Sequence, residues 1–95
     1  MVDIFWVTPK ESVKKQLKKL PKHIVRKLAV WVDSVERNGL RETQKTPGYH
    51  DEPLVGKRFG QWFIRLNRAY RAIYVIKSNG KIEFVEIEEV NKHDY

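Results

Sequence analysis

Residues 61–80 read QWFIRLNRAYRAIYVIKSNG, and apolar and polar side chains alternate along two runs of this stretch. The first run places Trp62, Ile64 and Leu66 on one face, and residues 69–77 alternate in the same way. Strict alternation is typical of a strand that buries only one face. The stretch therefore predicts two antiparallel strands joined by a short connection.

The dipeptide Asn79-Gly80 follows the second strand and is typical of a two-residue hairpin turn. It predicts a third strand over residues 81–90 that runs antiparallel to the second. In the register of that turn Arg71 lies opposite Glu88, so we expect a cross-strand ion pair between them.

Two helices are predicted between a short first strand and these three strands. Residues 2–7 are rich in β-branched and aromatic side chains, which favours a strand. Thr8 and Glu11 have the spacing of a capping box, which predicts the start of a helix, and Pro21 ends that helix. Apolar side chains at helical spacing predict a second helix over residues 22–37.

The order β-α-α-β-β-β predicts an α+β fold: an N-terminal strand, an αα-hairpin and a three-stranded antiparallel meander, with the helices packed on one face of the sheet. Residues 40–60 contain several Gly and Pro residues and are expected to form a loop with a short apolar interruption. We expect one core between the second helix and the sheet. Its members are Leu28, Trp31, Val32, Trp62, Ile64, Tyr74 and Ile76.

A length of 95 residues predicts a single domain that spans residues 1–95. A hydrophobic fraction of 41% is enough for a folded core, which argues against a disordered chain. The sequence contains no cysteine, so we expect neither disulfides nor an oxidising compartment. The N-terminal residues fit neither a signal peptide nor a membrane span. We therefore expect a cytoplasmic protein without membrane contact.

Positive charge is concentrated in two segments. The sequence holds 19 Lys and Arg against 12 Asp and Glu, a formal net charge of +7. Residues 10–27 carry eight Lys or Arg and one Glu, and residues 57–77 carry six Lys or Arg and no acid. This pattern favours a polyanionic partner, of which nucleic acid is the first candidate. The lysines of the first helix and a basic turn at Lys57 and Arg58 are either solvated surface or phosphate contacts.

Two arginines are predicted to face each other across the sheet. With a three-residue connection at residues 67–69, Arg65 lies opposite Arg71, on the face away from Trp62. Like charges in this position cost up to about 1 kcal/mol, and an anion between them would relieve the repulsion. With Phe63 beside the arginines, this face suits single-stranded RNA. The alternative is a pair of solvated surface arginines flanked by acids.

The sequence supports neither a metal site nor a serine hydrolase. His23, His50 and His93 are far apart and lack the spacing of a zinc site. The three serines lack the sequence context of a nucleophile elbow. We therefore expect no metal, no cofactor and no serine hydrolase.

Two stretches resemble a known family. PLVGKRFGQWFIRLNRAYRAIY at residues 53–74, VNKHDY at residues 90–95 and the order of elements are similar to the RelE/ParE superfamily of toxins, most of all to the RelE and HigB mRNA interferases. The resemblance implies a toxin that enters the ribosomal A site and cuts mRNA there by attack of a 2′-hydroxyl, without a metal. It also implies an antitoxin that wraps around the toxin, and a complex that binds operator DNA through the antitoxin.

The resemblance assigns roles to particular residues. Arg71 matches the family's strand arginine and is expected to stabilise the transition-state phosphate, and Arg65 matches a basic residue that positions the RNA backbone. His93 falls where members carry an arginine or a histidine, and it is expected to transfer a proton. Tyr95 lies close to the family's C-terminal tyrosine and is expected to stack on a base. Phe63 departs from the pattern, because RelE has a lysine at this position.

Further contacts with RNA or the ribosome are expected from basic residues and one aromatic residue. These are Lys14, Lys15, Lys18, Lys19, Lys57, Arg58, Phe63, Arg68 and Lys92. The four lysines of the first helix, and the basic turn, are expected to contact ribosomal RNA rather than the cleaved strand. Two other functions stay open: a ParE-like inhibitor of DNA gyrase, and a nucleic-acid-binding domain without catalysis.

Overall fold

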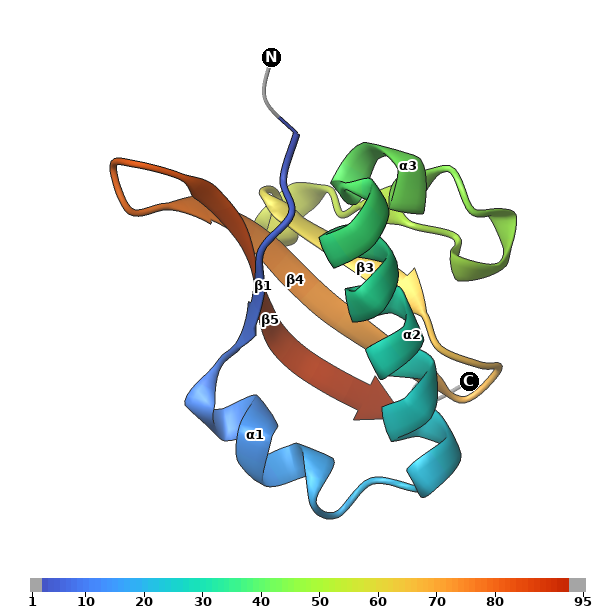
Figure 1. The fold of residues 1–95 in the computed structure, drawn as a ribbon. Coiled ribbons are helices and arrows are strands. Elements are labelled where there is room, and N and C mark those ends of the chain that lie inside the picture. Colours follow the sequence, from blue (N-terminus) through green and yellow to red (C-terminus); the bar gives the residue numbers. More distant parts are fainter. Residues whose placement is uncertain (1–2, 93–95) are drawn as a thin grey trace.

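The computed structural model describes residues 3–92, which form the α+β fold that the sequence predicts. In chain order the elements are β1 (Val7–Pro9), α1 (Glu11–Leu17), α2 (Lys22–Asn38), α3 (Leu40–Gln44), β2 (Glu52–Pro53), β3 (Gln61–Arg65), β4 (Tyr70–Ser78) and β5 (Glu83–Lys92), with 3-10 turns at Pro47–Tyr49 and Gly56–Arg58. Within residues 3–92 the strands form a five-stranded sheet in the order β1-β5-β4-β3-β2 (Figure 1). β1 runs parallel to β5, and the other neighbours are antiparallel.

The hairpin of β3 and β4 has the predicted register. Trp62 pairs with Tyr74, and Arg65 pairs with Arg71. The side-chain oxygen of Asn67 closes the connection by accepting the backbone N–H groups of the second and third residues after it, both at 2.7 Å. Because an asparagine side chain can bond to the backbone in this way, it stabilises a tight turn. The predicted pairing of the two arginines is confirmed.

The turn between β4 and β5 differs from the prediction. Ser78 pairs with Glu83, so the connection has four residues instead of two. The side-chain oxygen of Asn79 accepts the backbone N–H groups of Lys81 and Ile82 at 2.9 and 3.0 Å. These two hydrogen bonds stabilise the longer turn, which is why the prediction of a two-residue turn is wrong.

The longer turn changes the partner of Arg71. A β-bulge where Ile73 and Tyr74 pair with β5 shifts the register further. Arg71 therefore pairs with Asn91, and the predicted pairing with Glu88 is wrong. The carboxylate of Glu88 instead lies 3.7 Å from the Lys10 ammonium.

β1 lies later in the chain than the strand predicted at residues 2–7. Thr8 pairs with Glu86 of β5, and the N–H of Lys10 donates to the β5 backbone at 3.0 Å. These hydrogen bonds keep the chain extended as far as Lys10, so α1 begins at Glu11 without a side-chain cap. The predicted capping box is therefore wrong.

α2 ends where the sequence predicts, because Gly39 has a positive φ of 90°. A Cβ at Gly39 would collide with a carboxylate oxygen of Asp3. The other oxygen of Asp3 accepts the backbone N–H of Arg41 at 3.3 Å, at the start of α3. Both the backbone conformation and the available space thus require glycine at this position.

The long loop predicted at residues 40–60 contains two elements that the sequence analysis missed. α3 buries Leu40 and Thr43, and the Thr43 hydroxyl lies 2.8 Å from that of Ser34 on α2. β2 is a two-residue edge strand whose Pro53 pairs with Trp62 of β3. A proline is acceptable there because an edge strand leaves some N–H groups outside the ladder.

The core lies between α2 and the sheet. Trp31 and Tyr74 are 0% and 1% exposed, and their ring centroids lie 5.1 Å apart. Trp62 stacks on Tyr74, with the ring centroids 6.2 Å apart. Leu28 and Ile64 are buried as predicted, and Val32 and Trp62 are half-buried. Ile76 is 37% exposed, so its prediction as a core residue is wrong.

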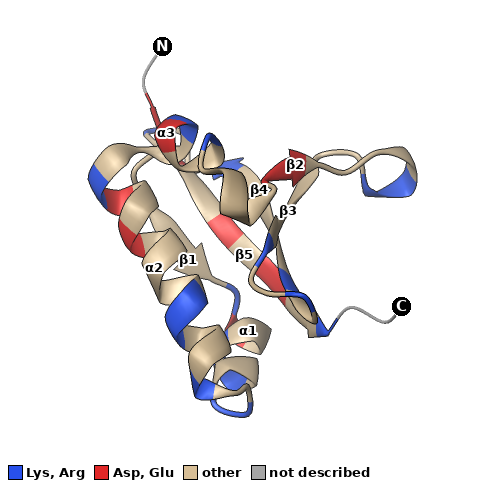
Figure 2. Cartoon of the chain, turned by 90° about the vertical axis from the view of Figure 1, so that its right-hand side faces the viewer, with Lys and Arg blue, Asp and Glu red and all other residues tan. Residues whose placement is uncertain are grey.

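The other side of β3 and β4 carries Phe63, Arg65 and Arg71 and is called the open face. Figure 2 shows α1 and α2 on one side of the sheet, while the β2–β3 loop, residues 54–60, reaches out on the other. No helix within residues 3–92 has both the length and the apolar character that a membrane crossing requires.

Candidate active site

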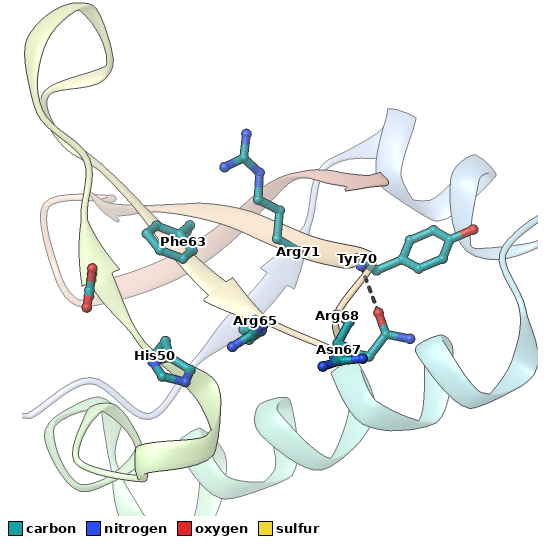
Figure 3. A pocket seen from close by; sticks show the side chains of 8 residues that line it. His50, Phe63, Arg65, Asn67, Arg68, Tyr70 and Arg71 are labelled. Atoms are coloured by element: carbon teal, nitrogen blue, oxygen red, sulfur yellow. Dashed lines mark hydrogen bonds between the residues drawn. The ribbon is translucent and has the colours of Figure 1, made fainter. Parts of the chain in front are cut away.

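A pocket of about 310 Å³ lies on the open face, beside the turn that joins β3 and β4 (Figure 3). It is lined by His50, Glu52, Phe63, Arg65, Asn67, Arg68, Tyr70 and Arg71. We call it the arginine pocket. Four of the residues selected from the sequence meet here, namely Phe63, Arg65, Arg68 and Arg71. The pocket is therefore the candidate active site.

Arg65 and Arg71 lie directly opposite each other on neighbouring strands. Within residues 3–92 the Nε of Arg71 is a buried donor without a hydrogen-bond acceptor. Leaving a donor in this state costs about 1–3 kcal/mol. A ligand with negative charge and acceptor oxygens would satisfy that donor and reduce the repulsion between the two arginines.

Glu89 is the acidic residue that interacts electrostatically with Arg71. It lies opposite Ile73 on β5, and therefore on the open face. The amide of Asn91, at 3.2 Å, and the positive charges of Arg58 and Arg71 together hold the pKa of Glu89 below its ordinary value. Glu89 thus offsets part of the positive charge, in the place where the sequence analysis expected Glu88.

Lys57 and Arg58 lie in the β2–β3 loop, which stands out from the sheet in Figure 2. The Nη2 of Arg58 lies 2.9 Å from a carboxylate oxygen of Glu89. Arg58 therefore reaches over the open face that also carries Arg71. Arg58 of the basic turn thus lies close to the candidate site rather than apart from it.

Two further glutamates, Glu86 and Glu88, mark where the positively charged part of the open face ends. Glu86 lies 2.7 Å from the Lys77 ammonium, and Glu88 is hydrogen-bonded to Glu86. That hydrogen bond lowers the pKa of Glu86 and raises the pKa of Glu88. Because these carboxyl groups repel phosphate, the end of β5 near Lys77 is unsuited to RNA.

His50 is a pocket residue that the sequence analysis dismissed as a metal ligand and did not select for any other role. It has a left-handed backbone conformation, with φ and ψ of 47°, and it lies near Arg65 in Figure 3. Histidine is among the residues that tolerate this conformation best. Glu52 joins the pocket because β2 pairs it with Phe63. The sequence carried no sign of either contact, because both depend on the fold of the α3–β2 loop, residues 45–51.

The remaining predicted residues fall in three places. Lys92 is exposed and pairs with Tyr70, a residue of the arginine pocket. His93 and Tyr95 lie outside the described residues, so their catalytic roles stay predictions. The lysines of the first helix region are exposed and do not line the pocket; they are Lys14, Lys15, Lys18 and Lys19.

Metal-ligating side chains do not cluster in the described chain. Residues 3–92 contain no group of three or more His, Asp or Glu side chains that could hold a metal ion.

Comparisons with known proteins identify the fold. Neither a family model nor a curated protein sequence matches the chain. The YoeB/ParE toxin from Agrobacterium tumefaciens is 19% identical, with a TM-score of 0.63 over 94% of this chain and 99% of that chain. A chain of the archaeal RelE–RelB complex from Pyrococcus horikoshii OT3 is 23% identical, with a TM-score of 0.67 over 93% of each chain. A chain of the heterotetrameric YoeB–YefM toxin–antitoxin complex from Staphylococcus aureus is also 23% identical, with a TM-score of 0.63 over 94% of this chain and 95% of that chain. The protein therefore has the same fold as these YoeB and RelE–RelB structures.

Proposed function

We propose that this protein is the toxin of a type II toxin–antitoxin system and an endoribonuclease that cuts mRNA in the ribosomal A site. The observation that carries the proposal is the arginine pair on the open face. Arg65 and Arg71 face each other across β3 and β4, and Arg71 offers a buried Nε that lacks an acceptor in the described chain. The fold shared with known toxins supports the same conclusion.

In the proposed reaction the 2′-oxygen of the RNA attacks the adjacent phosphorus, and the bond from phosphorus to the 5′-oxygen breaks. A base takes the proton of the 2′-hydroxyl, and an acid gives a proton to the leaving 5′-oxygen. The products are a 2′,3′-cyclic phosphate and a 5′-hydroxyl. Arg71 and Arg65 stabilise the additional negative charge on the phosphate oxygens. The nucleophile belongs to the RNA itself, so the reaction requires no metal or cofactor.

The proton transfers are assigned to the two histidines His50 and His93. His50 is supported by its place in the arginine pocket, beside Arg65 and Arg71. His93 is supported by the family pattern and by the direction of β5, which runs to Lys92 opposite Tyr70. Imidazole can act as both an acid and a base near neutral pH. Tyr95 is proposed to stack on a base.

The proposed RNA path follows the positive part of the open face. Phe63 offers an aromatic surface for a base, and Arg68 and Lys92 offer charges for neighbouring phosphates. Lys57 and Arg58 are proposed to contact phosphates from the β2–β3 loop. The four lysines at residues 14–19 are proposed to contact ribosomal RNA, because they lie away from the pocket.

The proposed protein partner is an antitoxin, through which the complex binds operator DNA. Two of the similar solved chains come from the RelE–RelB and YoeB–YefM complexes. A mainly apolar groove of about 430 Å³ offers a surface for such a partner. It is lined by residues of α1, α2, β1 and β5, including Leu17, Val25, Val32 and Ile87. We place the protein and its complex in the cytoplasm.

The test uses ribosomes programmed with a defined mRNA. The wild-type protein is expected to cut the mRNA in the A-site codon and to leave a cyclic phosphate, while an equal concentration of Arg71→Ala leaves the mRNA intact. The matched control is Arg37→Ala, because Arg37 is exposed on α2, where it forms an ion pair with Asp33. This control is expected to cut like the wild type.

Two outcomes would overturn the proposal. Inhibition of gyrase by a protein that leaves mRNA intact would indicate the ParE-like function. Binding to RNA without cleavage of any programmed mRNA would indicate a nucleic-acid-binding domain without catalysis.

A further inference from the structure

Asp51 follows His50 and points into the core instead of the solvent. The hydroxyl of Tyr74 donates a hydrogen bond to Oδ1 of Asp51 at 2.7 Å. Nε2 of Gln44, the last residue of α3, donates to the same hydroxyl at 2.9 Å. Tyr74 itself is 1% exposed, and its ring packs against those of Trp31 and Trp62. A rigid side chain of the core thus holds the carboxylate of a loop residue.

A second donor faces the same carboxylate. Oδ2 of Asp51 and Nε1 of Trp31 are both buried, and neither makes a hydrogen bond of good geometry within residues 3–92. Burial raises the pKa of Asp51 to about 6, and the Tyr74 hydroxyl and the Trp31 N–H oppose this increase. The carboxylate is therefore directed at two donors of the core.

The residue before His50 is also fixed. Tyr49 is 6% exposed, and the Lys27 ammonium lies 5.4 Å from its ring centroid. The backbone N–H of His50 donates to the carbonyl of Pro47 at 3.3 Å. His50 is thus held between the buried Tyr49 and the partly buried Asp51, while its own side chain lines the arginine pocket.

We propose that Asp51 is a positioning residue whose hydrogen bond to Tyr74 holds His50 in the arginine pocket. The inference rests on the proposed function, because it gives Asp51 a role in RNA cleavage that acts only through His50. A buried carboxylate is costly unless it is well paired, and a loop could be closed at lower cost by an apolar side chain. A carboxylate that is hydrogen-bonded to a fixed hydroxyl instead sets both the distance and the orientation of the loop relative to the core.

The kinetic test measures single-turnover cleavage on programmed ribosomes. Asp51→Ala is expected to lower the maximal rate by about tenfold to a hundredfold, because a displacement of about 1 Å can have an effect of this size. The ribosome concentration that gives half the maximal rate should stay within twofold, because Arg65 and Arg71 are untouched. Asp51→Asn keeps an acceptor for Tyr74 and is expected to restore most of the rate.

A double-mutant cycle separates positioning from a general loss of structure. His50→Asn removes the imidazole but tolerates the left-handed conformation. In the His50→Asn protein, the additional change Asp51→Ala is expected to alter the remaining rate less than twofold. An equal loss of rate with and without the imidazole would overturn the proposal.

A measurement without RNA keeps the inference separate from the proposed function. Tyr74→Phe removes only the hydroxyl, so this variant can replace Asp51→Ala in the measurement if Asp51→Ala does not fold. Both variants are expected to speed amide hydrogen exchange at His50 at least tenfold, with unchanged exchange in β4. Asp33→Asn, an exposed carboxylate of α2, is the control and should behave like the wild type. Unchanged exchange at His50 would overturn the inference, whereas absence of cleavage by the wild type would overturn only the proposed function.

Discussion

The guanidinium of Arg71 offers more than a positive charge. Its Nε is buried on the open face and lacks an acceptor in the part of the chain that the structure describes. A phosphate oxygen would supply that acceptor and would also lie between Arg71 and Arg65. Lysine has a single ammonium at the end of a flexible chain, so it cannot place a donor where the Nε of Arg71 lies.

Arg71→Lys is therefore expected to behave like a loss of function and not like a conservative change. We expect single-turnover cleavage to fall about a hundredfold, close to the effect of Arg71→Ala, because the lost donor acts on developing charge. Rapid mixing of programmed ribosomes with excess protein measures the rate. A rate within threefold of the wild type would show that charge alone is sufficient.

Gly39→Ala is expected to lower the free energy of unfolding by about 2 kcal/mol. Alanine is strained at the positive φ of Gly39, and its Cβ would meet the carboxylate of Asp3. Gly48→Ala is the matched control, because a Cβ there has no neighbour within 4 Å. Urea denaturation measures both variants, and equal midpoints would contradict the account of Gly39.

The arginine pocket contains residues that could be predicted from the sequence and one residue, His50, that could not. Arg65 and Arg71 could be found from the sequence, because a three-residue connection and strict alternation determine which residues pair. His50 could not, because its position depends on the burial of Asp51, and aspartate is usually exposed. A short polar loop gives no sign that one of its carboxylates has a partner in the core.

Among the elements, the β2–β3 loop has the most direct relation to the pocket. It carries Lys57 and Arg58, and Arg58 contacts the sheet through its ion pair with Glu89 at 2.9 Å. Glu89 therefore interacts with both Arg58 and Arg71. If RNA binds here as proposed, its phosphates would compete with this carboxylate for Arg58.

Glu89→Gln is expected to tighten the binding of single-stranded RNA about threefold to tenfold at low salt. Removing the carboxylate leaves two arginine charges available, which also makes the salt dependence steeper. Fluorescence anisotropy with a labelled oligonucleotide measures the affinity. Glu83→Gln, at the exposed start of β5, removes one negative charge at a distance from the pocket and is the control. Equal affinities of the two variants would exclude competition by Glu89.

The lysines near α1 form a second basic element on the other side of the molecule. Changing Lys14, Lys15, Lys18 and Lys19 to glutamine together is expected to weaken association with the ribosome and to reduce its salt dependence, because fewer counterions are released. Sedimentation with ribosomes at several salt concentrations provides the measurement. An unchanged salt slope would mean that these lysines are only solvated surface.

Errors in the predicted elements have identifiable physical causes. The Asn79-Gly80 turn is longer than predicted because the Asn79 side chain bonds two backbone N–H groups. The start of α1 is displaced because Thr8 belongs to β1, and β1 is extended by its hydrogen bonds to β5. A sequence pattern read over a few residues cannot reveal a partner that lies almost eighty residues away.

At the scale of the whole molecule, the buried carboxylate of Asp51 reduces stability at neutral pH. Its pKa is raised from 3.8 to about 6 in the folded protein. Between these values the folded state binds more protons than the unfolded state, so this group's contribution to stability falls as the pH rises from about 4 to 6. A fold that carries this cost at neutral pH is consistent with a role for the carboxylate in function.

The corresponding prediction compares the wild type with Asp51→Asn from pH 4.5 to 7.5. The difference between their free energies of unfolding is expected to change by about 2 kcal/mol over this range, with the variant gaining relative to the wild type as the pH rises. Urea denaturation at each pH measures the difference. Asp33→Asn is the control, and the proposed burial effect fails if both variants follow the same pH dependence.

The pairing of β1 with β5 also has a consequence for synthesis. The strand Val7–Pro9 finds its partners only at residues 85–87, so the sheet has contacts of very long sequence separation. While β5 is still inside the translating ribosome, β1 has no strand to pair with and β4 lacks one of its two neighbours. The nascent chain therefore cannot complete the sheet that supports the arginine pocket. The arginine pocket can therefore take its final form only after residues 85–87 have left the ribosome.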